Sequence, residues 1–334
     1  YLIEETLQIR GEDSKLTIEP GVTIKFAENT GLYVHKAALE AEGTKEKPII
    51  LTGQREQPGF WRGLAIRGSN HASNALNHVQ INYAGNQQTF DNVDPAALMF
   101  DASRGHNSFD VTNTTLQHSA SFGLYAEHDL SGDVGNNTVT ANKKGAVHIH
   151  PTSVTLLDET SSFSGNDRDE IRVWGAKLTD GTHTWPGVDV PYHVTGTIEA
   201  RNPSHFVLKP GVEMQFDENT GLYIHKAKFT AEGTESAPIK LTGHREVKGF
   251  WRGVAMRGSD SIDNALKHVT IEYAGSDNSF SNVNPAGLML DASRGANSLS
   301  IQNCTLQKNA SYGLYSEHDT KIDFANNSLT ANEN

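Results

Sequence analysis

Two matching triplets hold the side chains of this chain that are best suited to chemistry. Glu127-His128-Asp129 recurs as Glu317-His318-Asp319. On a β-strand the first and third residues of a triplet share a face, which would set two carboxylates beside an imidazole able to carry a proton. The alternative is that each triplet closes a turn, with its carboxylates solvated or accepting hydrogen bonds from backbone amides. We favour the turn, and the triplets are catalytic candidates only if the protein is an enzyme.

Aromatic and arginine side chains are the candidates for ligand binding. Aromatic faces stack on sugar rings, and arginine donates hydrogen bonds to hydroxyl and carboxylate groups. A tryptophan just before a strand can equally pack between layers of the fold, and this alternative stays open. A phenylalanine in a loop that protrudes from the fold is the stronger candidate. The candidates are Trp61, Arg62, Trp251 and Arg252, with Phe90 in loop 86–95 and Phe280 in loop 276–285.

Metal ligands are sparse in the sequence. Asp129 and Asp133 lie near Asn136 in an oxygen-rich segment, the kind of ligand set that calcium takes. The second copy of this segment carries Lys321, so the two copies would not share a simple site. His148 and His150 would point to one side of a strand without a third ligand, which favours a solvated surface. We therefore expect no cofactor, with calcium as the one cation left open.

The composition excludes several classes of function. With 40 acidic against 28 basic residues, the net charge is -12. Nucleic acids and anionic membranes require clustered Lys and Arg, so neither is an expected partner. The single cysteine, Cys304, rules out an internal disulfide. No apolar run reaches the ~18 residues that span a bilayer, and no nucleophile elbow or P-loop is present. We therefore lean against an enzyme.

The sequence contains two copies of one long repeat unit. From Pro20 and Pro210 to Asn142 and Asn332, the two copies align at an offset of 190 residues without an insertion. Residues 28–33 return at 218–223, residues 59–63 at 249–253, and residues 101–105 at 291–295. A long unit repeated in register is typical of stacked repeat architectures.

Short β-prone runs separated by turn residues fill each copy. The runs in the first copy are 22–26, 32–35, 49–52, 64–67, 79–83, 98–101, 109–112, 123–126, 138–140 and 146–149. Similar tetrads begin at residues 97, 123 and 145, which are 26 and 22 residues apart. This spacing matches one turn of a β-solenoid, and asparagines after the strands, such as Asn113, can hydrogen-bond from coil to coil.

The motifs resemble those of right-handed parallel β-helix repeat proteins of the pectin-lyase-like superfamily. The resemblance rests on Leu-Thr-Ile-Glu-Pro-Gly-Val at 16–22, Ala-Glu-Gly-Thr at 41–44, Trp-Arg-Gly at 61–63 and Ile-Asn-Tyr-Ala-Gly at 81–85. It is closest to bacterial secreted or cell-surface members. It implies a single-stranded right-handed parallel β-helix, while the catalytic signatures of the superfamily's enzymes cannot be carried over residue by residue.

These observations predict one continuous β-helix over residues 1–334, built from copy A (1–190, with connecting coils at 144–190) and copy B (191–334). The chain starts at Tyr1 and copy B stops before its own connecting coils, so we expect a larger parent chain. The leading hypothesis is a non-catalytic extracellular module that binds polysaccharide or another cell-surface polymer. The alternatives are a polysaccharide lyase or glycoside hydrolase, and a structural stalk.

Overall fold

The computed structural model describes residues 1–88, 90, 93–277, 280 and 283–333. The chain divides into two compact units. Unit 1 is Tyr1–Arg172 with Val188–Val190, and unit 2 is Val173–Gly187 with Pro191–Asn334. This division falls before residue 190, the limit expected for copy A. One continuous helix over the whole chain stays a prediction.

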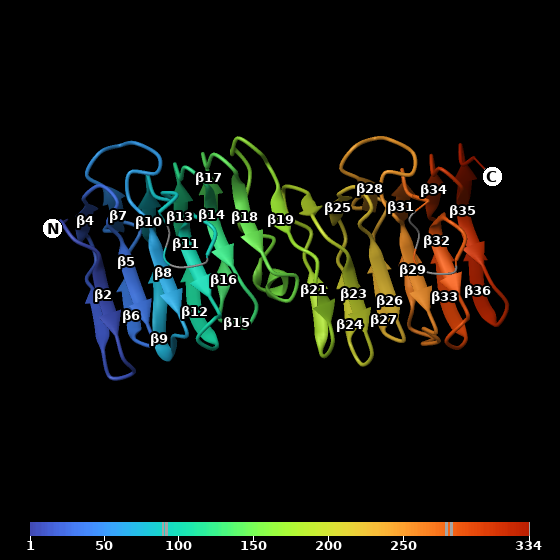
Figure 1. Cartoon of the computed structure of the whole chain (residues 1–334), viewed down its shortest axis with the longest axis horizontal. Helices are drawn as coiled ribbons and strands as arrows, with labels where there is room; N and C mark the ends of the chain where they lie inside the picture. Colours follow the sequence, from blue (N-terminus) through green and yellow to red (C-terminus); the bar gives the residue numbers. More distant parts are fainter. Residues whose placement is uncertain (89, 91–92, 278–279, 281–282, 334) are drawn as a thin grey trace. The chain divides into compact units, whose positions relative to one another are not determined.

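Unit 1 is built from three parallel sheets (Figure 1). The first contains β1 (Leu2–Ile3), β4 (Thr23–Phe26), β7 (Ile49–Gly53), β10 (Val79–Asn82), β13 (Thr115–Gln117) and β17 (Thr138–Thr140). The second contains β2 (Leu7–Arg10), β5 (Leu32–His35), β8 (Leu64–Arg67), β11 (Ala96–Asp101), β14 (Phe122–Ala126) and β18 (Gly145–Ile149). The third contains β3 (Lys15–Ile18), β6 (Ala38–Glu42), β9 (Asn70–Asn77), β12 (Asn107–Thr112), β15 (Leu130–Ser131) and β16 (Val134–Gly135).

Unit 2 has the same three-sheet arrangement. One sheet contains β20 (Lys177–Leu178), β23 (Ile198–Arg201), β26 (Leu222–His225), β29 (Val254–Arg257), β32 (Ala286–Asp291) and β35 (Tyr312–Ser316). A second contains β21 (Thr182–Trp185), β24 (His205–Leu208), β27 (Lys228–Glu232), β30 (Ala265–Lys267), β33 (Asn297–Gln302) and β36 (Thr320–Ala325). The third contains β22 (Tyr192–Val194), β25 (Glu213–Phe216), β28 (Ile239–Gly243), β31 (Val269–Glu272), β34 (Thr305–Gln307) and β37 (Ser328–Thr330).

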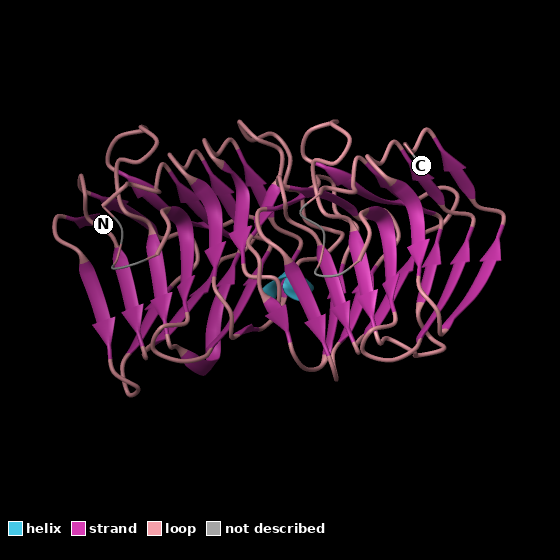
Figure 2. Ribbon diagram, turned by 45° about the vertical axis from the view of Figure 1, so that its right-hand side comes forward, coloured by secondary structure: helices cyan, strands magenta, loops and turns pink. Residues whose placement is uncertain are grey.

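Among the described residues the only helix is a single 3-10 turn, η1 (Ser153–Leu156), drawn in cyan in Figure 2. The short strand β19 (Ile171–Val173) contains the point at which the two units divide. No helix of the described chain is both long and apolar enough to cross a membrane.

Most coils place one strand in each sheet, so equivalent residues of successive coils stack in rows. Along the second sheet of unit 1, Leu32, Leu64, Leu98, Leu124 and Val147 are register partners and point into the core. Because side chains alternate across a strand, the residues between them point outward. The all-β, parallel β-helix fold expected from the sequence is confirmed.

Asparagine side chains connect the coils at the turns. Asn113 has a positive φ of 51° and donates from Nδ2 to Oδ1 of Asn77, 3.0 Å away. Buried Asn137 accepts from the amide of Thr114 at 2.9 Å and donates to the carbonyl of Val111 at 2.7 Å. These bonds satisfy polar groups that burial would otherwise leave unpaired, as the sequence predicted for Asn113.

Candidate binding grooves

We name the sheet β2-β5-β8-β11-β14-β18 the site sheet of unit 1, and β20-β23-β26-β29-β32-β35 the site sheet of unit 2. On the outward face of unit 1, register partners form a charged row of Arg10, His35, Arg67 and Asp101. The equivalent row of unit 2 is Arg201, His225, Arg257 and Asp291. Each unit therefore displays two arginines flanking a histidine on one sheet face.

A small groove lies on the site sheet of unit 1. It has a volume of about 150 Å³ and is lined by Gln8, Arg10, Tyr33 and Phe90. The Arg10 guanidinium lies 4.9 Å from the centre of the Tyr33 ring, and its Nε donates to Oε1 of Gln8 at 2.8 Å. The groove combines one exposed cation with two aromatic rings.

A larger groove lies at the equivalent place in unit 2. Its volume is about 530 Å³, within the range of small-molecule sites. Its lining is Thr197, Glu199, Arg201, Tyr223, Arg252, Arg257 and Phe280. Arg201 donates from both Nε and Nη2 to Oε2 of Glu199, at 2.9 and 2.7 Å. Three guanidinium groups therefore meet an aromatic pair.

Burial and the flanking arginine charges together lower the pKa of the histidine in each row. Burial, followed by the positive charges of Arg10 and Arg67, lowers the pKa of His35. Burial and the charges of Arg201 and Arg257 lower the pKa of His225 in the same way. Both imidazoles are therefore kept neutral near pH 7, and the arginines carry the positive charge of each groove.

The loop phenylalanines pack against the site sheet and do not protrude. Phe90 is only 8% exposed, and its ring stacks on Tyr33 with the ring centres 5.4 Å apart. Phe280 stacks on Tyr223 at 5.2 Å. A Cβ at Gly31 would lie 2.5 Å from the Phe90 ring, so only glycine leaves room for this contact. The expectation of an exposed loop aromatic is wrong for Phe90 and Phe280, although both line their grooves. The other residues of the two loops that lie outside the described part of the chain are 89, 91–92, 278–279 and 281–282.

The tryptophan candidates are corrected to core residues. Trp61 is fully buried, stacks on Phe26 with ring centres 4.2 Å apart, and donates from Nε1 to the carbonyl of Asn82 at 2.8 Å. Trp251 makes the equivalent stack on Phe216 at 4.3 Å. A ring enclosed on all sides cannot stack on a sugar, so neither tryptophan is a ligand contact.

The arginines next to these tryptophans point away from the core, toward the loop phenylalanines. Arg62 lies over the Phe90 ring at 5.6 Å, and Arg252 lies over the Phe280 ring at 5.5 Å. Arg252 also lines the groove of unit 2. Both arginines thus remain ligand candidates.

The glutamates of the two triplets hold turns. Glu127 accepts from the amide of Ala102 at 2.8 Å and from the hydroxyl of Tyr125 at 3.1 Å. Burial and the Glu127 carboxylate raise the pKa of Tyr125, which keeps its hydroxyl protonated as a donor. Glu317 accepts from the amide of Ala292 at 3.0 Å. His128 lies 3.3 Å from its neighbour Asp129, and both side chains are exposed; the His128 ring also contacts the His150 ring, with the centres 5.7 Å apart. This geometry supports the turn interpretation.

We expect the change Glu127→Gln to lower the free energy of unfolding by about 1 kcal/mol, because it replaces charge-assisted hydrogen bonds by neutral ones. Urea unfolding followed by circular dichroism measures the loss. Glu317→Gln is the matched change in unit 2 and should cost less, since it removes one such bond. An unchanged stability for Glu127→Gln would show that the carboxylate does not hold the turn.

The two acids named as calcium candidates do not gather with further acidic or imidazole ligands in the described part of the chain. Within the described residues, neither Asp129 nor Asp133 belongs to a group of three or more His, Cys, Asp or Glu ligand atoms within 4.8 Å of one another. The main-chain atoms of Asp133 bind Val111 and Asp110. His148 is mostly buried and pairs with Asp94 at 2.9 Å, which corrects its assignment to a solvated strand face.

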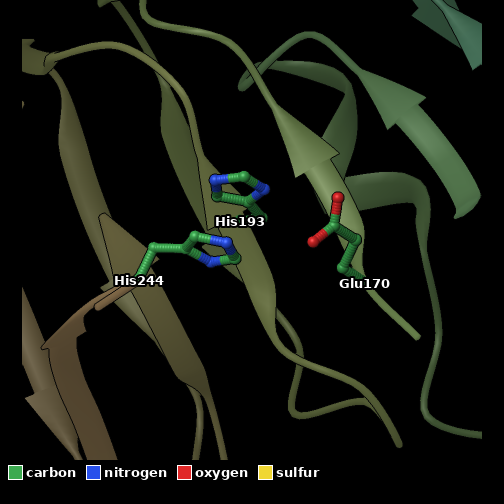
Figure 3. Close-up of side chains that lie close together, drawn as sticks. All are labelled: Glu170, His193 and His244. Atoms are coloured by element: carbon green, nitrogen blue, oxygen red, sulfur yellow. The ribbon is translucent and has the colours of Figure 1, made fainter. Parts of the chain in front are cut away.

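Two histidines of unit 2 form a pair that the sequence did not indicate. The rings of His193 and His244 stack with their centres 4.0 Å apart (Figure 3). His193 Nε2 lies 2.9 Å from Asp217 Oδ1, and His244 Nδ1 lies 3.3 Å from Gln215 Oε1. Figure 3 also draws Glu170, a residue of unit 1. The histidines are 51 positions apart and belong to no motif, so only the register of the coils could have paired them.

The parallel strands stack coil upon coil, and this arrangement defines a parallel β-helix protein. One face of each unit carries a groove lined by arginine and aromatic side chains. Residues 1–93 match the family model of the pectate-lyase-like beta helix domain. This match confirms the expected resemblance in the first part of the chain. No curated protein and no solved structure matches the chain.

Proposed function

We propose that this protein is a non-catalytic, extracellular binding module for an acidic cell-surface polysaccharide. The observation that carries the proposal is the recurrence of one groove chemistry on both units. In each unit a tyrosine stacked against a loop phenylalanine lines a groove together with arginine of the site sheet, which is Arg10 in unit 1 and Arg201 with Arg257 in unit 2.

Acidic sugars fit this chemistry. A guanidinium group binds a carboxylate through two parallel hydrogen bonds, and the part of an aromatic ring that borders a groove can contact the apolar side of a sugar. On a chain of net charge -12, a local group of arginines selects for negative charge. A polymer that engages both grooves would bind more tightly than one groove alone, because the second contact becomes intramolecular.

The hydrogen bonds of the two triplets argue against the enzyme alternative. Glu127 and Glu317 are occupied by backbone amides, and His128 and Asp129 lie in an exposed turn. These contacts leave the triplets without the positioned acid and base that sugar cleavage requires.

Titration calorimetry of the full chain with oligosaccharides tests the proposal. Tetrasaccharides of a hexuronic acid and of a neutral hexose are compared at low and high salt. We expect the acidic ligand to bind and to weaken with added salt, because screening reduces charge attraction. Arg201→Ala combined with Arg252→Ala should weaken binding at the unit 2 groove at least tenfold.

A matched control is Arg168→Ala, which removes an exposed arginine outside both grooves. It should leave binding unchanged. Absence of binding by every oligosaccharide would favour the structural stalk, and shortened oligosaccharides in the mass spectrum would favour an enzyme. Either result contradicts the proposal.

A further inference from the structure

We propose that Gln8 and Glu199 make the two grooves differ in their preference for charge, so that the unit 1 groove selects acidic sugars more strongly. This inference rests on the proposed function. The two residues occupy the same place in their units: Gln8 is the register partner of Tyr33, and Glu199 is the register partner of Tyr223.

The difference lies in what the adjacent arginine binds. In unit 2, the carboxylate of Glu199 takes two donors of Arg201 and neutralises its charge. In unit 1, the neutral amide of Gln8 takes one donor of Arg10. The other end of each guanidinium makes the same contact in both units. Nη1 of Arg10 lies 3.3 Å from Nδ1 of His35, and Nη1 of Arg201 lies 3.3 Å from Nδ1 of His225. Of these two equivalent arginines, Arg10 is therefore the one without a carboxylate partner among the described residues, and it is free to bind a ligand carboxylate.

The remaining charges of the two site sheets are nearly matched. Arg67 pairs with Asp101 in unit 1, and Arg257 pairs with Asp291 in unit 2. Arg62 and Arg252 lie over their phenylalanines at similar distances. Lys177 is an exposed register partner of Glu199 on β20, but it is not part of the groove lining. The exchange of glutamine for glutamate is thus the electrostatic difference at the register position beside Tyr33 and Tyr223.

The size of the effect follows from the exposure of the pair. Arg201 and Glu199 have side-chain exposures of 37% and 27%, so their attraction is partly screened by water. Charge pairs in such settings change an equilibrium constant by up to about fivefold. We expect about a fivefold effect of each exchange on the affinity for an acidic ligand.

Two backgrounds isolate the grooves in the full chain. In the first background, Arg201→Ala with Arg252→Ala weakens binding at the unit 2 groove, so that the unit 1 groove is measured. In the second background, Arg10→Ala with Arg62→Ala weakens binding at the unit 1 groove, so that the unit 2 groove is measured. Adding Gln8→Glu to the first background should weaken binding of the hexuronic acid tetrasaccharide about fivefold. Adding Glu199→Gln to the second should strengthen it about fivefold. The neutral hexose tetrasaccharide should bind within twofold of each parent in both cases.

The outcomes separate the two proposals. If acidic ligand binds but neither exchange alters the ratio of acidic to neutral affinity, the inference about Gln8 and Glu199 is wrong and the proposed function stands. If no oligosaccharide binds either background or the unaltered chain, the proposed function fails and the inference fails with it. Circular dichroism of every variant verifies that a lost affinity is not a lost fold.

Discussion

Replacing Trp61 by alanine is expected to lower the free energy of unfolding of the coils around it by about 3–5 kcal/mol, the usual loss for a large buried aromatic residue. The ring is fully enclosed, lies nearly parallel to Phe26 at 4.2 Å, and forms a hydrogen bond to the carbonyl of Asn82. Alanine would leave a cavity and an unpaired carbonyl. Amide hydrogen exchange of peptides from β4, β8 and β10 measures the loss locally, which matters because repeat folds open coil by coil.

Two further variants give this prediction its controls. Trp61→Phe keeps a ring against Phe26 and loses the hydrogen bond, so it should cost less than the alanine change. Trp251→Ala removes the matching stack on Phe216 and should produce an equal loss in the coils of unit 2. A change below about 1 kcal/mol for Trp61→Ala would contradict the core assignment, since surface substitutions lie in that range.

The strand pattern was largely readable from the sequence because short β-prone runs are separated by turn residues. Predicted runs 32–35, 64–67 and 138–140 coincide with β5, β8 and β17. The sequence missed β6, whose Ala-Leu-Glu-Ala-Glu composition favours a helix, and β9, whose asparagines are rare in strands. In both cases the neighbouring coils supply register partners, which override local propensity.

The grooves were much harder to predict than the strands. The direction in which Trp61 points depends on the shape of the coil, and the sequence left that open. Arg10 and Arg67 belong to one charged row only because the strands of separate coils align in register. Gln8 and Glu199 carry no motif, since their significance appears only when each is placed beside the arginine two residues later.

The register also explains why the loop phenylalanines were misjudged. A phenylalanine among polar residues is typical of an exposed binding loop. Here, however, Tyr33 on β5 and Gly31, which lies just before β5, form a surface against which Phe90 packs. This surface can be recognised only after the loop 86–95 is placed over the site sheet.

His148 is expected to make the stability of unit 1 fall steeply in acid. The side chain is 13% exposed, packs against Phe122 and Tyr125, and pairs with Asp94. Burial is the largest influence and lowers its pKa from 6.5 to about 4; the charges of Arg172 and Lys144 act in the same direction, while Asp94 opposes them. The folded protein thus holds a neutral imidazole over a pH range in which the unfolded chain binds a proton.

The sign of the effect follows from this difference in proton binding. The contribution of His148 to the free energy of unfolding is fully present above pH 6.5 and is lost as the pH falls through about 4, because the unfolded state then binds more protons. The shift corresponds to a loss of about 3 kcal/mol. Urea unfolding between pH 7.5 and 3.5 measures it, with His148→Gln as the comparison. Because the variant lacks this proton uptake, the stability of the unaltered protein relative to His148→Gln should fall by about 3 kcal/mol as the pH is lowered from 7.5 to 3.5, whereas parallel curves would show that His148 takes up its proton as readily in the folded state as in the unfolded chain.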